Sequence, residues 1–280
     1  MKKLWKAFAV CCAIAMLGSA FTACKSDDDD DDGDKKPVGN GQQTPAITMN
    51  GTAYETIKAA IAEIPTSGDT GTYTIKLAKG TYNENALEYN GSATIKISGD
   101  TTTKYGADVI IKGHGSDMTT LKTRNLIGIQ GTGDIILENL TLESDWSRAD
   151  HAGDVQAEVL GTDTKGNTIA YNCAFKSHQD TLRTAGKAWF YGCYIEGDVD
   201  FIWMEQAGSV ALYEKCDLVF LYESAKSADS NYSVLFVART GTKTAPKIGK
   251  GYVLLNSTVT VKDGVTNYLG RNAGSGDFYD

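Results

Sequence analysis

Short apolar segments separated by polar turns dominate the chain from about residue 70 onward. Segments that are rich in β-branched residues and bounded by turn-forming residues are typical of β-strands. We expect strands at residues 73–77, 94–97, 109–111 and 135–142. A unit of seven residues then recurs, in which an apolar segment is followed by a polar turn residue, a small residue and, two positions later, a β-branched, leucine or aromatic residue. Its five copies begin at Ile136, Ile169, Trp189, Leu212 and Val253.

Cysteine occupies the small-residue position in three of these copies, at Cys173, Cys193 and Cys216, which lie 20 and 23 residues apart. This period suits the coils of a parallel β-helix, in which each coil stacks on the last at about 4.8 Å. The cysteines would then form an inward ladder of small hydrophobes, or two of them could form a disulfide. An antiparallel sandwich, the competing fold, predicts hairpin signals and no fixed long period. We therefore predict an all-β, right-handed parallel β-helix, or solenoid.

One helix signal precedes the strands, in residues 47–65. Thr52 and Glu55 have the spacing of a capping box, and Pro65 lies where the helix is expected to stop. The apolar residues between these points recur on one helical face: Tyr54, Ile57, Ile61 and Ile64. We expect an amphipathic helix that caps the N-terminal end of the solenoid.

Composition and charge exclude several classes of protein. With 41% hydrophobic and 22% charged residues, the chain can bury a sizeable core. No apolar run of 18 residues follows the extreme N-terminus, which argues against a polytopic membrane protein. A formal net charge of −8 leaves no basic face to neutralise phosphates, so we expect no nucleic-acid partner.

The first 23 residues have the features of a signal peptide. Lysines at positions 2, 3 and 6 precede an apolar stretch at residues 7–21, which is too short to span a bilayer comfortably. The segment Phe21-Thr-Ala-Cys24 resembles a bacterial lipobox, which implies lipidation of Cys24 after cleavage. The alternative is an ordinary secretory signal with an incidental cysteine.

An acidic tether is expected at residues 24–46. Aspartate fills positions 27–32, and six adjacent carboxylates repel one another and bury nothing. An acidic tract directly after the lipidated cysteine resembles the surface-export signals of Bacteroidetes lipoproteins. This implies a lipid anchor in the outer membrane of a Gram-negative bacterium with the protein at the cell surface, or else an anchor that faces the periplasm. Residues 47–280 then form the folded domain, which we expect to be monomeric.

The repeat register places two carboxylates in one column. Asp180 lies seven residues after Cys173, and Asp200 lies seven residues after Cys193. If the cysteines stack, the two aspartates occupy equivalent positions on adjacent coils, with their carboxylates about 5 Å apart. At an effective dielectric near 20 the two charges repel by about 3 kcal/mol, so the pair should titrate as a unit. Such a pair suits nucleophilic attack with proton transfer, although aspartate ladders can also bind calcium or lie solvated in turns.

The segments Gln179-Asp-Thr-Leu182 and Asp200-Phe-Ile202 resemble the paired signatures of pectin methylesterases, the pectinesterase family of carbohydrate esterases. Further segments resemble other motifs of this family in the family's order, and the resemblance extends from about residue 47 to the C-terminus. They are Gly80-Thr-Tyr-Asn-Glu84, Gln156-Ala-Glu-Val-Leu160, Val237-Ala-Arg-Thr240 and Tyr268-Leu-Gly-Arg271.

The resemblance implies hydrolysis of the methyl esters of pectin (homogalacturonan), with release of methanol and with neither a metal nor a cofactor. Asp200 would be the nucleophile. Asp180 would protonate the departing methanol and then deprotonate the water that resolves the acyl-enzyme. Gln156 and Gln179 would donate to the oxyanion. Arg271 would hold Asp200 ionised and contribute to substrate binding.

The sequence departs from the family at several positions near the expected site. Trp203 is a candidate sugar-stacking residue or a core residue, and Met204 follows it where the family has glycine. Asn272 and Ala273 stand where the family has Pro-Trp, and the family continues beyond the position of Asp280, which suggests a domain shortened at its C-terminus. The second functional hypothesis is therefore a carbohydrate-binding lipoprotein that kept the fold without efficient chemistry. Retention of both aspartates, both glutamines and the arginine favours the esterase.

Overall fold

The computed structural model describes residues 46–146, 150–151, 156–204, 206, 208–221, 232–238, 241–242, 245–246, 251–261 and 266–270. The expected signal peptide, the acidic tether with Cys24, and the segment with Arg271, Asn272 and Ala273 lie outside these residues. Within the described part of the chain, no helix has the length and apolar character needed to cross a bilayer.

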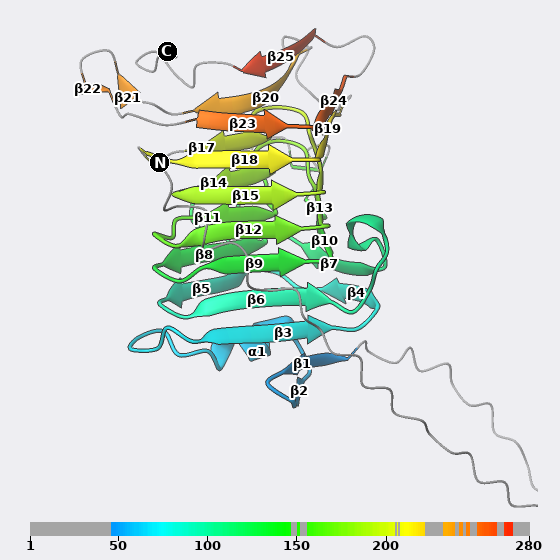
Figure 1. The fold of residues 1–280 in the computed structure, drawn as a ribbon, viewed down its shortest axis with the longest axis vertical. Helices are drawn as coiled ribbons and strands as arrows, with labels where there is room; N and C mark the ends of the chain where they lie inside the picture. The colour runs from blue at the N-terminus through cyan, green and yellow to red at the C-terminus, as the bar shows by residue number, and fades with distance from the viewer. Residues whose placement is uncertain are drawn as a thin grey trace, which may run out of the picture. The chain divides into compact units, whose positions relative to one another are not determined.

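The chain folds into three sheets, here called A, B and C, which it visits in turn on every coil (Figure 1). Sheet A contains β2 (Thr52–Tyr54), β1 (Ile47–Met49), β3 (Thr72–Leu77), β6 (Thr94–Gly99), β9 (Ile135–Glu138), β12 (Asn167–Tyr171), β15 (Lys187–Tyr191), β18 (Val210–Glu214) and β23 (Gly251–Leu255). Sheet B contains β4 (Gly80–Asn83), β7 (Val109–Gly113), β10 (Thr141–Ser144), β13 (Ala174–Lys176), β16 (Tyr194–Gly197), β19 (Asp217–Phe220) and β24 (Thr258–Thr260). Sheet C contains β5 (Leu87–Gly91), β8 (Ile127–Gly131), β11 (Leu160–Thr162), β14 (Leu182–Thr184), β17 (Ile202–Met204), β20 (Tyr232–Ala238) and β25 (Thr266–Gly270).

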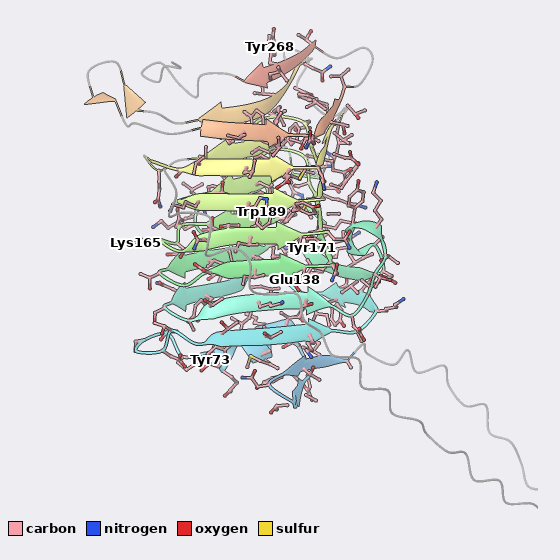
Figure 2. All side chains as sticks on the ribbon, viewed as in Figure 1. Tyr73, Glu138, Lys165, Tyr171, Trp189 and Tyr268 are labelled. Atoms are coloured by element: carbon pink, nitrogen blue, oxygen red, sulfur yellow. The ribbon has the colours of Figure 1, made fainter. Side chains whose placement is uncertain are left out.

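From β3 onward, each strand of the three sheets pairs in parallel with the equivalent strand of the next coil, as in the pair of β12 and β15, where Ile169 faces Trp189. Parallel strands joined by such connections almost always form right-handed crossovers. The structure confirms the predicted right-handed parallel β-helix. Figure 2 shows Glu138, Tyr171 and Trp189 on the outer face of sheet A, where side chains alternate with those that enter the core. A two-residue pair, β21 (Gly241–Thr242) and β22 (Ala245–Pro246), lies outside the three sheets.

A single residue with positive φ turns the chain from sheet A to sheet B on successive coils. These residues are Asn139 (54°), Asn172 (51°), Gly192 (60°), Lys215 (54°) and Asn256 (52°). Asparagine and glycine tolerate this left-handed conformation better than most residues. The expected strand at residues 135–142 is therefore wrong, because the chain turns at Asn139 between β9 and β10. Each unit found in the sequence is one such corner.

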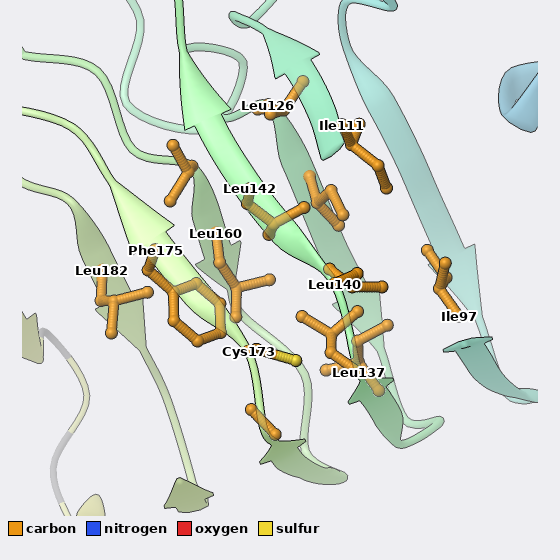
Figure 3. Packing of buried hydrophobic residues seen from close by; sticks show 14 of the residues in the cluster. Ile97, Ile111, Leu126, Leu137, Leu140, Leu142, Leu160, Cys173, Phe175 and Leu182 are labelled. Atoms are coloured by element: carbon orange, nitrogen blue, oxygen red, sulfur yellow. The ribbon is translucent and has the colours of Figure 1, made fainter. Parts of the chain in front are cut away.

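The residue after the corner is buried on four successive coils, and the cysteine ladder is confirmed. Cys173, Cys193 and Cys216 are fully buried and free of disulfides. Leu140 occupies the same position one coil earlier and is also buried. Figure 3 shows Leu140 and Cys173 among aliphatic side chains from the three sheets, so cysteine here acts as a small apolar residue.

We expect the three thiols to react slowly in the folded protein, because each is fully buried and out of reach of a reagent. Burial raises the pKa of Cys173 to about 12, so at pH 8 almost no nucleophilic thiolate forms there. A soluble form that begins after Cys24 should therefore label slowly with a thiol reagent when folded, and should take up three labels when denatured without reductant. Uptake of a single label by the denatured protein would contradict the free-thiol arrangement.

The N-terminal segment begins with a hairpin rather than with the expected capping box. β1 and β2 pair antiparallel, and the turn between them is Asn50-Gly51, with φ of 51° and 83°. An Asn-Gly pair with positive φ at both residues is the preferred two-residue hairpin turn. Because this turn places Thr52 in β2, the predicted capping role of Thr52 and Glu55 is wrong.

The capping helix itself is present and is short. α1 (Ile57–Ala62) begins after Thr56, whose hydroxyl accepts a hydrogen bond from the N–H of Ala59 at 3.0 Å. Glu84, at the end of β4, accepts from the first two N–H groups of the helix at 2.6 and 2.9 Å. The buried face of α1, which includes Ile57 and Ile61, belongs to the solenoid core. The helix thus covers the N-terminal end of that core, as predicted.

Thr56→Ala is expected to destabilise the protein by about 1 kcal/mol, the usual cost of losing an N-cap side chain. Thr52→Ala, at an exposed strand position, should change the free energy of unfolding by less than about 0.5 kcal/mol. Urea denaturation of the two variants compares these costs directly. If Thr52→Ala lowers the free energy of unfolding as much as Thr56→Ala or more, Thr52 would be the capping residue.

Candidate active site

Asp180 and Asp200 occupy equivalent positions on adjacent coils, at the turn from sheet B to sheet C. Two residues further on, Leu182 of β14 faces Ile202 of β17 in the parallel ladder. The N–H of Asp180 donates to the carbonyl oxygen of Val199 at 3.0 Å, which continues the pairing to the aspartates. The structure confirms the register that the cysteine spacing predicts.

Both aspartates adopt the left-handed backbone conformation, with φ of 64° at Asp180 and 52° at Asp200. They are only 5% and 8% exposed. Burial of two neighbouring carboxylates is unfavourable unless hydrogen bonds or opposite charges compensate. Positive φ at residues other than glycine occurs often at functional sites, where the surrounding structure maintains it. The burial of two adjacent carboxylates makes the corner between sheets B and C the candidate site.

The two glutamines expected to bind the oxyanion lie on neighbouring coils of the same corner. Gln156 and Gln179 form an isolated parallel bridge, and the N–H of Ala157 donates to the carbonyl oxygen of Gln179 at 3.2 Å. Both side chains are partly exposed. Gln179 directly precedes Asp180, so the structure gathers both glutamines and both aspartates on three successive coils.

Arg124 is a site residue that sequence reasoning missed. It lies just before β8, one coil before Gln156, and is 7% exposed. Its guanidinium donates to Gln156 Oε1 at 2.5 Å, to Asp180 Oδ2 at 2.7 Å, and to both carboxylate oxygens of Glu158 at 2.7 and 2.8 Å. One arginine therefore joins an expected oxyanion donor to an expected acid–base group.

Glu158 continues this charge network below the surface. It is 1% exposed, and its Oε1 lies 3.8 Å from Nε of Arg183, which is itself 2% exposed. Nη1 of Arg183 donates to Asp163 at 2.8 Å. Positive and negative groups thus alternate through Arg124, Glu158, Arg183 and Asp163. One signal in the sequence could have revealed this network, because the charged Glu158 stands where the corresponding family motif has valine.

Trp203, expected to stack on a sugar or to lie in the core, is buried. It is 4% exposed and packs with Val234 and Val237. Its ring lies 5.9 Å from the guanidinium carbon of Arg183, the neighbouring residue on β14. This is the core arrangement, and the ring has no open face for a sugar. Met204 is also buried in the main core.

A second pair of titratable residues lies two positions before the aspartates. Nδ1 of His178 is 3.9 Å from Oδ2 of Asp198, and Asp198 is fully buried. Arg271, the expected partner of Asp200, lies outside the described residues. Among the residues that the structure does describe, no group of three or more His, Cys, Asp or Glu side chains is arranged to hold a metal ion.

The fold and this corner define a parallel β-helix protein with stacked carboxylates beside paired amides. The Pectinesterase family model matches residues 46–273. The chain belongs to the pectinesterase family.

Relatives of known sequence agree with this assignment. "Pectinesterase 1" of Citrus sinensis is 26% identical over 255 residues, which cover 85% of this chain and 40% of the relative. "Pectinesterase" of Aspergillus niger is 29% identical over 241 residues, which cover 80% of this chain and 66% of the relative. The chain therefore spans about two fifths of the citrus protein and about two thirds of the fungal one.

Solved structures share the fold. Pectin methylesterase from carrot is 20% identical, with a TM-score of 0.62 over 80% of this chain and 67% of that chain. A pectin methylesterase in complex with a hexasaccharide is 25% identical, with a TM-score of 0.58 over 79% of this chain and 67% of that chain.

Proposed function

We propose that this protein hydrolyses the methyl esters of pectin and releases methanol. The observation that carries the proposal is the stacked pair of Asp180 and Asp200, buried in register at one corner of a pectinesterase-family solenoid. The adjacent amides of Gln156 and Gln179 support it, because acyl transfer needs hydrogen-bond donors for a developing oxyanion. The complex of a related pectin methylesterase with a hexasaccharide supports an extended saccharide substrate.

In the proposed reaction, a carboxylate oxygen of Asp200 attacks the ester carbonyl carbon and forms a tetrahedral oxyanion that the two glutamines stabilise. The bond to the methoxy oxygen breaks, and a proton from Asp180 converts the leaving group to methanol. Water then attacks the galacturonyl carbonyl carbon of the resulting anhydride and gives one proton to Asp180. The bond from this carbon to the Asp200 oxygen breaks, which restores the Asp200 carboxylate and releases the galacturonic acid, which ionises. Arg271 is proposed to hold Asp200 ionised.

The function can be tested on methylated pectin by measuring methanol and titratable carboxylate together. We expect the two products to appear in equal amounts and at a rate that a metal chelator leaves unchanged. If the protein is retained on immobilised pectin but releases no methanol from any pectin, the carbohydrate-binding hypothesis replaces the esterase.

We also propose that the mature protein is anchored by lipid on Cys24, in the outer membrane and at the cell surface. The lipobox-like segment before Cys24 and the acidic tract after it support this location. Cys24→Ala should move the protein from the membrane fraction to the soluble fraction. Cys12→Ala, inside the expected signal peptide, is the matched control and should leave the protein in membranes. Unchanged membrane association of the Cys24 variant contradicts the anchor.

The membrane face has its own test. Protease added to intact cells should degrade the protein if it is exposed at the surface. Survival in intact cells, with degradation after the outer membrane is opened, would instead indicate an anchor that faces the periplasm.

A further inference from the structure

Arg124 contacts two of the expected site residues, Gln156 and Asp180, although it lies in none of the motifs. Its partners are 32, 34 and 56 residues away along the chain and come from two successive coils. The bidentate pair with Glu158 fixes the plane of the guanidinium, because the two parallel bonds of 2.7 and 2.8 Å allow one orientation. With the plane fixed, Nη1 reaches Gln156 and Nη2 reaches Asp180.

The contact with Gln156 determines which end of its side-chain amide faces the guanidinium. Arginine can only donate hydrogen bonds, so the group at 2.5 Å from Nη1 must be the amide oxygen. The amide nitrogen of Gln156 then lies on the other side of the planar group. If the amide of Gln156 were flipped, its NH₂ group would face the N–H donors of Nη1 of Arg124, and no hydrogen bond could form. Arg124 thus selects the orientation in which the two N–H groups of Gln156 face away from it.

The contact with Asp180 fixes one oxygen of that carboxylate. Nη2 holds Oδ2 at 2.7 Å, in a contact that is buried on both sides. The positive charge of Arg124 would strongly favour an ionised Asp180 if it acted alone. Glu158 shares that guanidinium bidentately and offsets its charge, so the pair orients the carboxylate as a nearly neutral unit.

We propose that Arg124, with Glu158 as its counter-ion, is a positioning residue of the esterase site. It turns the N–H groups of Gln156 toward the oxyanion and anchors Asp180 beside the leaving group. This inference rests on the proposed esterase function in one respect, which is that the oxyanion lies on the side of Gln156 that faces away from Arg124. Glu158 is required so that the arginine can be buried there with its plane fixed. Arg183 extends the network through Glu158, whose Oε1 lies 3.8 Å from its Nε.

Two variants separate positioning from simple charge balance. Arg124→Met combined with Glu158→Leu replaces the buried pair by apolar residues of similar volume, a change that folds tolerate. Arg124→Lys keeps the charge but cannot form the planar set of four bonds. For both, we expect kcat for methanol release to fall about 10²-fold, the usual cost of losing an oxyanion donor, with KM within about threefold of wild type. If Arg124 serves only to balance charge, Arg124→Lys should instead keep kcat near the wild-type value, which would contradict positioning.

A second readout does not depend on activity. In protein labelled with ¹⁵N-glutamine, the side-chain amide signal of Gln156 can be assigned by its loss in Gln156→Ala. We expect this signal to move toward the position of a solvated glutamine in the paired variant. An unchanged signal, or a folded paired variant with kcat within threefold of wild type, overturns the proposal. If the wild type releases no methanol while the signal moves, Arg124 positions Gln156 and the esterase function is what fails.

Discussion

Asp180→Asn is expected to lower the rate of methanol release by at least about 10²-fold while the protein remains folded. Asparagine keeps the shape of the side chain, and its amide oxygen can still accept the hydrogen bond from Arg124. It cannot give a proton to the methoxy group or take one from water, and positioned acid–base groups contribute about 10²–10⁴-fold.

The control for this substitution is Asp100→Asn, at an exposed position after β6 and outside the site. Initial rates of methanol release and thermal melting should be measured on both variants. A rate within a few fold of wild type for Asp180→Asn would remove Asp180 from the mechanism, whatever the family motif implies.

Glu158→Gln is expected to cause the largest loss of stability among single conservative substitutions in this site. It leaves Arg124 buried without its bidentate partner and takes the second carboxylate from Arg183. Removal of one member of a buried ion pair costs about 3–5 kcal/mol, because the remaining charge stays out of water.

The matched control is Glu143→Gln on sheet B. Glu143 accepts a hydrogen bond from Lys112 at 2.6 Å, but the two side chains are 29% and 40% exposed. An exposed pair of this kind contributes up to about 1 kcal/mol. Urea denaturation should therefore show a loss of unfolding free energy that is several-fold larger for Glu158→Gln than for Glu143→Gln. Similar losses of unfolding free energy in the two variants would mean that the buried charge network contributes no more to stability than an exposed ion pair does.

The features that could be predicted from the sequence are those that repeat. Cys173 and Cys193 mark equivalent places on successive coils, so their spacing predicts both the solenoid and the stacking of Asp180 with Asp200. The family motifs then name Gln156 and Gln179 as neighbours of that pair. A stacked fold converts a constant offset in the sequence into contact in space, which makes this inference possible from a single chain.

The errors arose where a local signal was weaker than its competitor. The turn at Asn139 lies between two apolar segments, so the hydrophobic pattern continues through it and predicts one strand instead of two. At the N-terminus, Thr52 and Glu55 have capping-box spacing, yet Asn50-Gly51 forms a hairpin turn that places Thr52 in a strand. In both cases the conformation of one or two residues with positive φ decided the outcome.

Arg124 could not have been found from the sequence, because it lies in no repeat unit and in no family motif. Glu158 carried a signal, a charged residue at an apolar position of the family motif, but its partner could not be identified without coordinates. Trp203 shows the converse. Its place directly after Asp200-Phe-Ile suggests a substrate-facing ring, whereas packing against Val234 and Val237 buries it.

In the proposed mechanism, a carboxylate at position 200 performs the ester cleavage. The most direct test compares methanol release from methylated pectin by the wild type and by Asp200→Ala, prepared identically and matched in melting temperature. We predict steady release by the wild type and no release above background by the variant, because alanine has no carboxylate with which to attack the ester carbonyl. Comparable release by the two proteins would show that Asp200 is not the nucleophile.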